Sequence, residues 1–217
     1  MEYKKELINV KEDLENKKVQ LIIKRAFDVI ASSIGLIVLS PIFLIMSILI
    51  KIDSKGPVFF KQERVGLNRQ PFKIFKFRTM VNDAEKKGRQ ITVGSDSRIT
   101  KVGHFIRKYK LDEFPQLINV FKGEMSLVGP RPEVPRYVEL YDAKQEQILL
   151  VKPGITDYAS IEFRNENDIL GKSLNPDKEY IENIMPSKID LNMKYIKEIS
   201  LLTDIKIIMK TLICIIR

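Results

Sequence analysis

The chain has 217 residues, which suffices for one compact domain and is short for two. Its 37 Lys and Arg against 28 Asp and Glu give a formal charge of +9, which indicates an acidic partner: nucleic acid, phospholipid or a phosphorylated substrate. A single cysteine, Cys214, excludes an intramolecular disulfide, and a single histidine, His104, excludes a metal site built from several histidines.

An uncharged apolar run extends from Val29 to Ile50 and has Ser40-Pro41 near its centre. Its 22 residues suffice to cross a bilayer, which takes about 20 apolar residues in a helix. Pro41 removes a backbone donor and clashes with the preceding turn, so the helix has to bend there. Basic residues flank the run on both sides, whereas a spanning helix usually has its Lys and Arg excess on the cytoplasmic flank only. We therefore expect a re-entrant hairpin broken at Ser40 and Pro41, with both ends on the anionic cytoplasmic face, and a kinked spanning helix is the alternative.

The other expected elements surround this run. Residues 1–21 carry charges of both signs and are expected to form an exposed arm. Aromatic and β-branched residues at 58–60 and 72–77 predict the two strands of a small β-hairpin. Residues 99–110 predict a basic amphipathic helix, suited either to a membrane interface or to an ordinary protein surface. The segment 205–217 has a wider apolar arc, which favours membrane contact or docking against the hairpin, and its packing would support a homodimer.

The adjacent carboxylates Asp112-Glu113 are the main candidates for catalysis. Pro115 is tolerated in a first helical turn and Gly123 is a typical stop, so we predict a helix that begins near the pair and ends at Gly123. Both acids would then lie at the positive end of the helix dipole. A carboxylate there binds Mg²⁺ through oxygen or attacks phosphorus as a nucleophile. Taken alone, such a pair more often serves only as a helix cap.

Several cations are suited to binding phosphate. Prolines on both sides of Arg131 reduce its backbone freedom, so its planar guanidinium is presented at little entropic cost. A structural turn with a surface arginine is the alternative. Lys76 and Arg78 lie beside an apolar strand, and Arg164 follows the turn Pro153-Gly154-Ile155-Thr156.

In this order the motifs closely resemble the bacterial sugar transferases of the monotopic phosphoglycosyl transferase family. The resemblance covers roughly residues 22–212 and consists of Lys24-Arg25-Ala26-Phe27-Asp28, Ser40-Pro41, Phe77-Arg78-Thr79-Met80, Leu111-Asp112-Glu113 with Gln116-Leu117 and Asn119, Met125-Ser126-Leu127-Val128-Gly129-Pro130-Arg131-Pro132 and Pro153-Gly154-Ile155-Thr156. The chain departs from many members at residues 157–163, where Asp-Tyr-Ala-Ser-Ile replaces Gly-Trp-Ala-Gln-Val and Glu-Phe replaces Asn-Gly. These differences bear on the identity of the sugar rather than on the reaction.

The resemblance implies transfer of a sugar 1-phosphate from a UDP-sugar to a polyprenyl phosphate, such as undecaprenyl phosphate, as the first membrane step of glycoconjugate assembly. It implies that Asp112 is the nucleophile that forms a phosphosugar intermediate and releases UMP. It implies that Glu113 is a Mg²⁺ ligand or positioning group next to Asp112. The substrate- and phosphate-binding cations that it implies are Lys76, Arg78, Arg131 and Arg164.

We therefore predict a helix-rich α+β protein with a single domain. It comprises the arm 1–21, a re-entrant membrane helix 22–52 and a catalytic domain 53–217, monotopic on the cytoplasmic face of the bacterial inner membrane and in contact with phospholipid. Because the chain shows no extra N-terminal spanning helices, we expect a minimal catalytic unit. The alternatives are a non-catalytic basic membrane scaffold and a nucleotide-sugar hydrolase. The apolar run and the lack of a recognised nucleic-acid motif oppose nucleic-acid binding.

Overall fold

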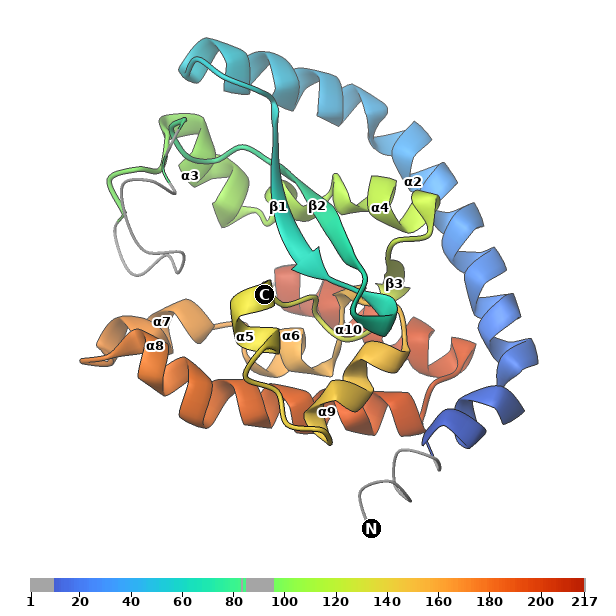
Figure 1. Ribbon diagram of the computed structural model, residues 1–217. Coiled ribbons are helices and arrows are strands. Elements are labelled where there is room, and N and C mark those ends of the chain that lie inside the picture. The colour runs from blue at the N-terminus through green and yellow to red at the C-terminus, as the bar shows by residue number, and fades with distance from the viewer. Residues whose placement is uncertain (1–9, 83, 85–95, 217) are drawn as a thin grey trace.

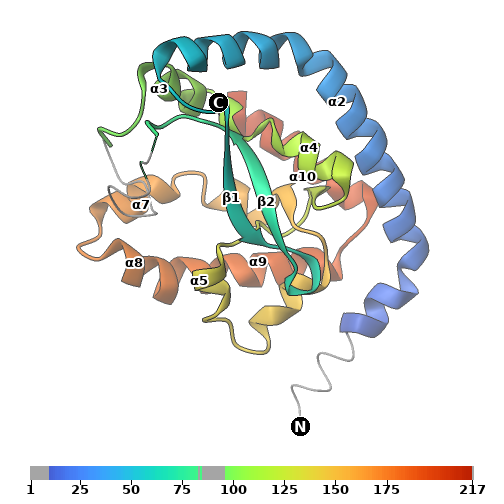
Figure 2. The ribbon, with the colours of Figure 1, turned by 45° about the horizontal axis from the view of Figure 1, so that its top comes forward.

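The computed structural model describes residues 10–82, 84 and 96–216. A long curved helix, α2 (Lys18–Asp53), runs around one side of a helical body, and a β-hairpin lies between them (Figures 1 and 2). The expected helix-rich single domain with a small sheet is confirmed. Of the expected arm, residues 1–9 lie outside the described residues, and residues 10–16 are helical.

α2 contains the whole apolar run and remains one helix through Ser40 and Pro41. The expected break is therefore a bend within a continuous helix, visible as the curvature of α2 in Figure 1, and the two halves of the expected hairpin are not separated by a loop. The Ser40 hydroxyl donates to the Ile37 carbonyl at 2.7 Å. That carbonyl is the acceptor which Pro41, having no N–H, cannot pair, so the serine replaces the missing bond and the helix continues.

The face of α2 that meets the body of the protein is polar in its first half. Lys24, Asp28 and Ser32 lie one turn apart and are all buried. The outward face is apolar, and its exposed large side chains include Ile30, Ile34, Ile37, Val38, Leu44, Ile45, Ile48 and Ile52. A helix on a water-soluble protein has the opposite pattern, so this surface requires apolar surroundings. α2 is also long and apolar enough to cross a membrane.

The predicted β-hairpin is confirmed. β1 (Phe59–Val65) pairs antiparallel with β2 (Pro71–Phe77), with Phe59 opposite Phe77. A short 3₁₀ turn, Leu67–Arg69, joins the strands with Asn68 in the left-handed region at φ +53°. Phe77 is 1% exposed and packs edge-on against Phe43 of α2. The hairpin therefore fixes the second half of α2 to the body of the protein.

A second, parallel strand pair escaped prediction. β3 (Ser126–Val128) and β4 (Gly154–Thr156) pair in parallel, and each is followed or preceded by a proline-glycine turn. The Gly154 N–H donates to the Pro130 carbonyl at 2.9 Å, and the Gly129 N–H donates to the Thr156 carbonyl at 3.1 Å. A Cβ atom on Gly154 would lie 2.0 Å from the Gly129 nitrogen, so a side chain at Gly154 would collide with the facing backbone. The loops at residues 129–132 and 153–156 are thus joined through backbone contacts between their glycines.

The remaining elements form the helical body. They are α3 (Lys101–Lys108), α4 (Gln116–Lys122), α5 (Pro135–Val138), α6 (Tyr158–Glu162), α7 (Glu166–Lys172), α8 (Pro176–Glu179), α9 (Met185–Lys197) and α10 (Leu201–Ile216), with 3₁₀ turns at Leu111–Glu113 and Gln145–Leu150 and a π-turn at Tyr180–Ile184. The helices expected at 99–110 and 205–217 are present as α3 and α10. On α3, Ile106 is buried in the core, whereas Phe105 and Tyr109 are about half exposed.

Candidate active site

The carboxylate pair Asp112-Glu113 lies in a 3₁₀ turn ahead of α4, not in the first turn of that helix. Pro115 has no N–H to offer the Leu111 carbonyl, which instead accepts from Phe114 at 3.2 Å. The predicted helix start is therefore wrong by about one turn, whereas the predicted end at Gly123 is confirmed. The charges of the two acids are consequently balanced by side chains and not by a helix dipole.

Glu113 is held by two cations from distant parts of the chain. Lys76 Nζ on β2 lies 2.8 Å from Glu113 Oε1, and Arg131 Nη2 lies 2.6 Å from the same oxygen. Arg131 Nη1 approaches the other oxygen, Oε2, at 3.5 Å. Burial by itself raises the pKa of the Glu113 carboxyl, but the charges of Arg131 and Lys76 outweigh it and hold the pKa well below its usual range. Glu113 is therefore a carboxylate held in its ionised form, and it orients both cations.

Asp112 differs from Glu113, because no cation is paired directly with its carboxylate in the described part of the chain. Within the described part of the chain its carboxylate has no ion-pair partner, although it lies next to Glu113. Burial and then the charge of Glu113 raise the pKa of Asp112, while Lys76 and Arg107 act in the opposite direction. An unpaired carboxylate among cations is available to attack an electrophile, because no strong hydrogen bond has to be broken first.

Arg107, on α3, is a site residue that the sequence interpretation missed. Its Nε donates to the Thr79 hydroxyl at 2.8 Å, and its charge acts on Asp112. The available signal was a cation five residues before Asp112, but the sequence analysis assigned this basic helix either to a membrane interface or to an ordinary protein surface and not to the site. Three cations, Lys76, Arg107 and Arg131, therefore surround the carboxylate pair.

Arg131 is fixed through its backbone as well as its guanidinium. Its N–H donates to Asp157 Oδ2 at 3.1 Å, and Asp157 is fully buried at the start of α6, where its other oxygen accepts from the Ser160 N–H. The preceding Gly129 is locked against Gly154. The loop therefore presents Arg131 in one position, as the flanking prolines led us to expect, and Asp157 is a second residue that the sequence interpretation missed.

The structure gives Arg78 a structural role in place of the expected phosphate contact. Its guanidinium is buried and donates to the carbonyls of Lys55, Ser54 and Ile50 at 2.5, 2.7 and 3.3 Å. These carbonyls lie at or just beyond the carboxyl end of α2, which otherwise lacks partners for them. A Cβ atom on Gly56, whose φ is +133°, would lie 2.1 Å from Arg78 Nη1, so the turn after α2 accommodates this side chain.

Arg164 lies apart from these contacts. It is exposed on the connection between α6 and α7, and its Nη1 is 3.5 Å from the Cys214 carbonyl near the end of α10. Among the described residues, no ion pair or hydrogen bond joins it to Asp112 or Glu113. The structure thus brings together Asp112, Glu113, Lys76 and Arg131, and leaves Arg78 and Arg164 outside that cluster.

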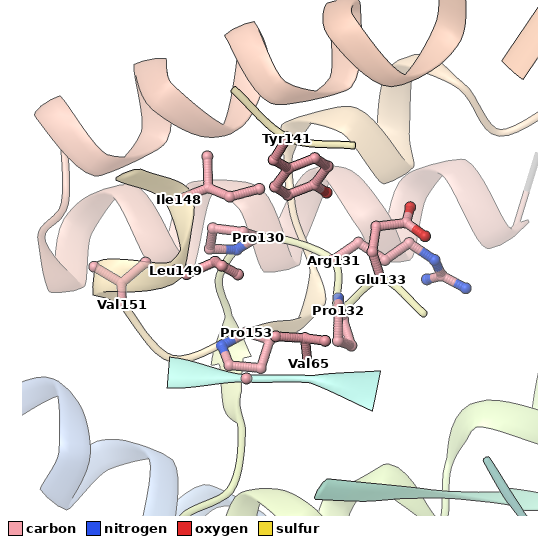
Figure 3. Close-up of a pocket in the computed structure, with 11 residues that line it drawn as sticks. Val65, Pro130, Arg131, Pro132, Glu133, Tyr141, Ile148, Leu149, Val151 and Pro153 are labelled. Carbon is pink, nitrogen blue, oxygen red and sulfur yellow. The ribbon is translucent and has the colours of Figure 1, made fainter. Parts of the chain in front are cut away.

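Two small hollows adjoin Arg131. One lies between the end of β1 and the loops at 129–132 and 153–156, with Tyr141, Glu133 and Arg131 toward one end and apolar residues such as Val151 toward the other (Figure 3). The second lies between Arg131 and α9.

The family model described as bacterial sugar transferase matches residues 19–217. The chain belongs to the bacterial sugar transferase family. Among the curated bacterial sugar transferases, it is 39% identical over 193 residues to the UDP-N-acetylgalactosamine-undecaprenyl-phosphate N-acetylgalactosaminephosphotransferase of Aeromonas hydrophila, covering 88% of this chain and 43% of that protein. It is also 39% identical over 198 residues to the UDP-glucose:undecaprenyl-phosphate glucose-1-phosphate transferase of Escherichia coli K12, covering 89% and 40%.

A shorter relative is matched over most of its own length. The chain is 44% identical over 154 residues to a putative undecaprenyl-phosphate N-acetylgalactosaminyl 1-phosphate transferase of Bacillus subtilis, which covers 70% of this chain and 82% of that protein. In contrast, the chain spans only about two fifths of the Aeromonas and Escherichia relatives. Family membership, predicted from the motifs, is thus established for this chain.

Proposed function

We propose that this chain transfers a sugar 1-phosphate from a UDP-sugar to undecaprenyl phosphate, with release of UMP. The observation that carries the proposal is an unpaired carboxylate, Asp112, beside a Glu113 that is clamped by Lys76 and Arg131. The names of the Aeromonas and Escherichia relatives give UDP-sugars as donors and undecaprenyl phosphate as acceptor. Phosphoryl transfer relies mainly on positioning and on cations, which this cluster supplies.

The reaction has two displacement steps at one phosphorus. In the first, an Asp112 carboxylate oxygen bonds to the sugar-linked phosphorus of the donor, and the bond from that phosphorus to the bridging oxygen breaks, so that UMP leaves with the electron pair. In the second, an oxygen of the lipid phosphate bonds to the same phosphorus and the bond to Asp112 breaks. The lipid phosphate is already an anion, so neither step needs a base, in keeping with the exposed position of His104.

The cations have distinct tasks in this scheme. Lys76 and Arg131, held by Glu113, are placed to bind the oxygens of the transferred phosphate, and Arg131 offers a planar fork for two of them. Arg107 stabilises the ionised form of Asp112. Arg164 would contribute to phosphate binding only if the connection between α6 and α7 approached the cluster when substrate binds.

Mg²⁺ fits this donor set as an ion shared with the substrate. Among the described residues no group of three metal-ligating side chains is present, but Mg²⁺ usually takes one or two carboxylates and completes its shell with phosphate oxygens and water. Asp112 and Oε2 of Glu113, which has only the 3.5 Å contact with Arg131, are the available protein oxygens. When bound, the ion would neutralise charge on the diphosphate.

We propose further that the protein is monotopic at the cytoplasmic face of the bacterial inner membrane. The apolar outward face of α2, bent at Pro41, supports this placement, as do the exposed Phe105 on α3 and Met209 on α10. Residues 10–16 would then lie on the same side as the catalytic body. Labelling of these residues from the cytoplasmic side only would support the placement, and labelling from the opposite side would contradict it.

The function is tested by measuring UMP release from a panel of UDP-sugars, with Mg²⁺ and undecaprenyl phosphate in nanodiscs. Release that depends on the lipid, together with formation of a polyprenyl diphosphate sugar, is the expected result. Release of UMP and free sugar phosphate without lipid would instead indicate a hydrolase. No release from any common donor would leave the scaffold alternative as the better account.

The pH dependence gives a further prediction. Only ionised Asp112 attacks phosphorus, and because its pKa is raised, kcat/KM should fall with decreasing pH earlier than for an ordinary carboxyl. Arg107→Gln removes a charge that lowers this pKa, so the acidic limb of the pH profile should move to higher pH. Lys108→Gln, an exposed neighbour on α3, is the control and should leave the limb in place. If the pH profiles of kcat/KM were the same for the Arg107 and Lys108 variants, the charge of Arg107 would not act on Asp112.

A further inference from the structure

Within the described residues, one edge of β2 has no partner strand, and β2 lies beside α4 (Figure 1). The backbone groups on that edge need partners other than a strand. Lys76 is on β2, and α4 directly follows the turn of Asp112 and Glu113. The attachment of this edge to α4 therefore sets the distance from Lys76 to the carboxylate pair.

The edge is attached through the side chain of Asn119, which is fully buried on α4. The Phe75 N–H donates to Asn119 Oδ1 at 3.0 Å, and Asn119 Nδ2 donates to the Lys73 carbonyl at 2.8 Å. One side-chain amide thus pairs an N–H and a C=O of β2 as the backbone of a neighbouring strand would. Phe75 directly precedes Lys76, so these bonds hold the backbone next to the point where the lysine side chain begins.

Asn119 is itself held in one orientation. Its Nδ2 also donates to Glu124 Oε2 at 2.7 Å, and its backbone carbonyl accepts from the N–H groups of Glu124 and Met125 just beyond the end of α4. Both N–H donors and the oxygen of the amide are therefore paired. Replacing such a buried amide is costly, because its partners would remain unpaired.

Apolar packing between β2 and α4 does not fix this register by itself. Ile74 packs with Val120 and Met125 in a small buried cluster. Such contacts are not directional and tolerate small shifts along the strand, whereas hydrogen bonds to one N–H and one C=O do not. Lys76 Nζ lies 2.8 Å from Glu113 Oε1, and moving it away by about 1 Å would lengthen the contact beyond hydrogen-bonding distance.

We infer that Asn119 is a positioning residue for the reaction, which sets Lys76 against Glu113 and so against the transferred phosphate. The inference rests on the proposed function. Among the described residues, the hydrogen bonds of the Asn119 side chain go to β2 and Glu124, and none goes to Asp112 or Glu113. Asn119 therefore acts through Lys76. A misplacement of about 1 Å can cost about 100-fold in rate, so a residue outside the cluster can strongly affect catalysis.

The test is a double-mutant cycle on kcat/KM for UMP release, using the full chain in nanodiscs with a UDP-sugar, Mg²⁺ and undecaprenyl phosphate. Asn119→Ala should lower kcat/KM by on the order of tenfold in the wild-type background. In the Lys76→Met background no ammonium remains to be misplaced, so the same substitution should change kcat/KM by less than about twofold. A residue that only stabilised the fold would have the same effect in both backgrounds.

Gln147→Ala is the matched control. Gln147 is also a buried amide, on the 3₁₀ turn 145–150, and its side chain makes no hydrogen bond to β2 among the described residues. Its substitution should change kcat/KM by the same factor with and without Lys76. Should Asn119→Ala fail to fold, Glu124→Ala takes its place, because it removes one partner of the Asn119 amide at a half-buried position and leaves both bonds to β2.

The outcomes keep this inference apart from the proposed function. If Asn119→Ala, or Glu124→Ala in its place, lowers kcat/KM by the same factor in both backgrounds, the assignment is overturned and the function stands. The assignment is also overturned if the substitution leaves kcat/KM unchanged in the wild-type background. If the wild-type chain releases no UMP from any donor, the proposed function itself has failed, and the inference fails with it.

Discussion

Asp112→Asn is expected to abolish formation of the phosphosugar intermediate and to lower UMP release by a factor on the order of 10³ or more. The amide has nearly the same shape as the carboxylate, but it lacks the charge and the nucleophilic oxygen. Without lipid, the wild-type protein should release UMP in a burst of about one per molecule, because the first step proceeds alone. The variant should show no burst, and mass spectrometry should detect the added phosphosugar only on the wild-type peptide that contains Asp112.

The surroundings of Asp112 make this test sharp. Its carboxylate has no ion-pair partner among the described residues, so the substitution breaks no salt bridge that would destabilise the fold. Asp177→Asn is the matched control, because Asp177 is a surface carboxylate whose partners, Arg136 and Tyr137, lie outside the site. A normal burst from the Asp112 variant would remove Asp112 from the mechanism, and Glu113→Gln would then be the next substitution to examine.

Local sequence signals predicted those parts of the fold that depend on neighbouring residues. Alternating aromatic residues gave the β1–β2 hairpin, and Gly123 ended α4 where a left-handed residue was needed. Pro41 was expected to break the apolar helix. The helix continued because Ser40, the adjacent residue, pairs the carbonyl that the proline leaves free. The prediction considered the proline alone and neglected the hydroxyl beside it.

Contacts between distant residues account for most of the other differences. Arg78 and Lys76 are two positions apart and were treated alike, but β2 ends at Phe77, so only Lys76 remains directed at Glu113. The carbonyls that accept hydrogen bonds from Arg78 lie at the end of α2, more than 20 residues earlier in the chain. No local sequence pattern predicts these contacts. The cluster of Asp112, Glu113 and Arg131 was predicted from motifs, whereas its support by Asp157 depends on the β3–β4 contact.

A buried ion pair joins α2 to the last helix, and breaking it is expected to cause the largest loss of stability. Lys24 Nζ lies 2.5 Å from Asp204 Oδ2 and 2.9 Å from the Val128 carbonyl, and both side chains are less than 10% exposed. The Tyr195 hydroxyl completes the network by donating to Asp204 at 2.8 Å. Lys24→Met leaves Asp204 buried without its cation, which should cost about 3–5 kcal/mol. For a chain of this size that corresponds to a decrease in Tm of roughly 6–20 °C.

The double variant Lys24→Met with Asp204→Leu separates the cost of an unpaired charge from that of a lost contact. Removing both charges eliminates the desolvated carboxylate, so the double variant should recover a large part of the Tm lost by Lys24→Met. Lys17→Met is the control: Lys17 also reaches across to a distant carbonyl, that of Lys197 at 2.7 Å, but at an exposed site, so Tm should change little. If the double variant were as unstable as the sum of the single variants, the pair would act by packing alone. Recovery would instead show that the loss in Lys24→Met comes from the uncompensated Asp204 carboxylate, buried where the first turns of α2 meet α10 and the strand that leads into the Arg131 loop.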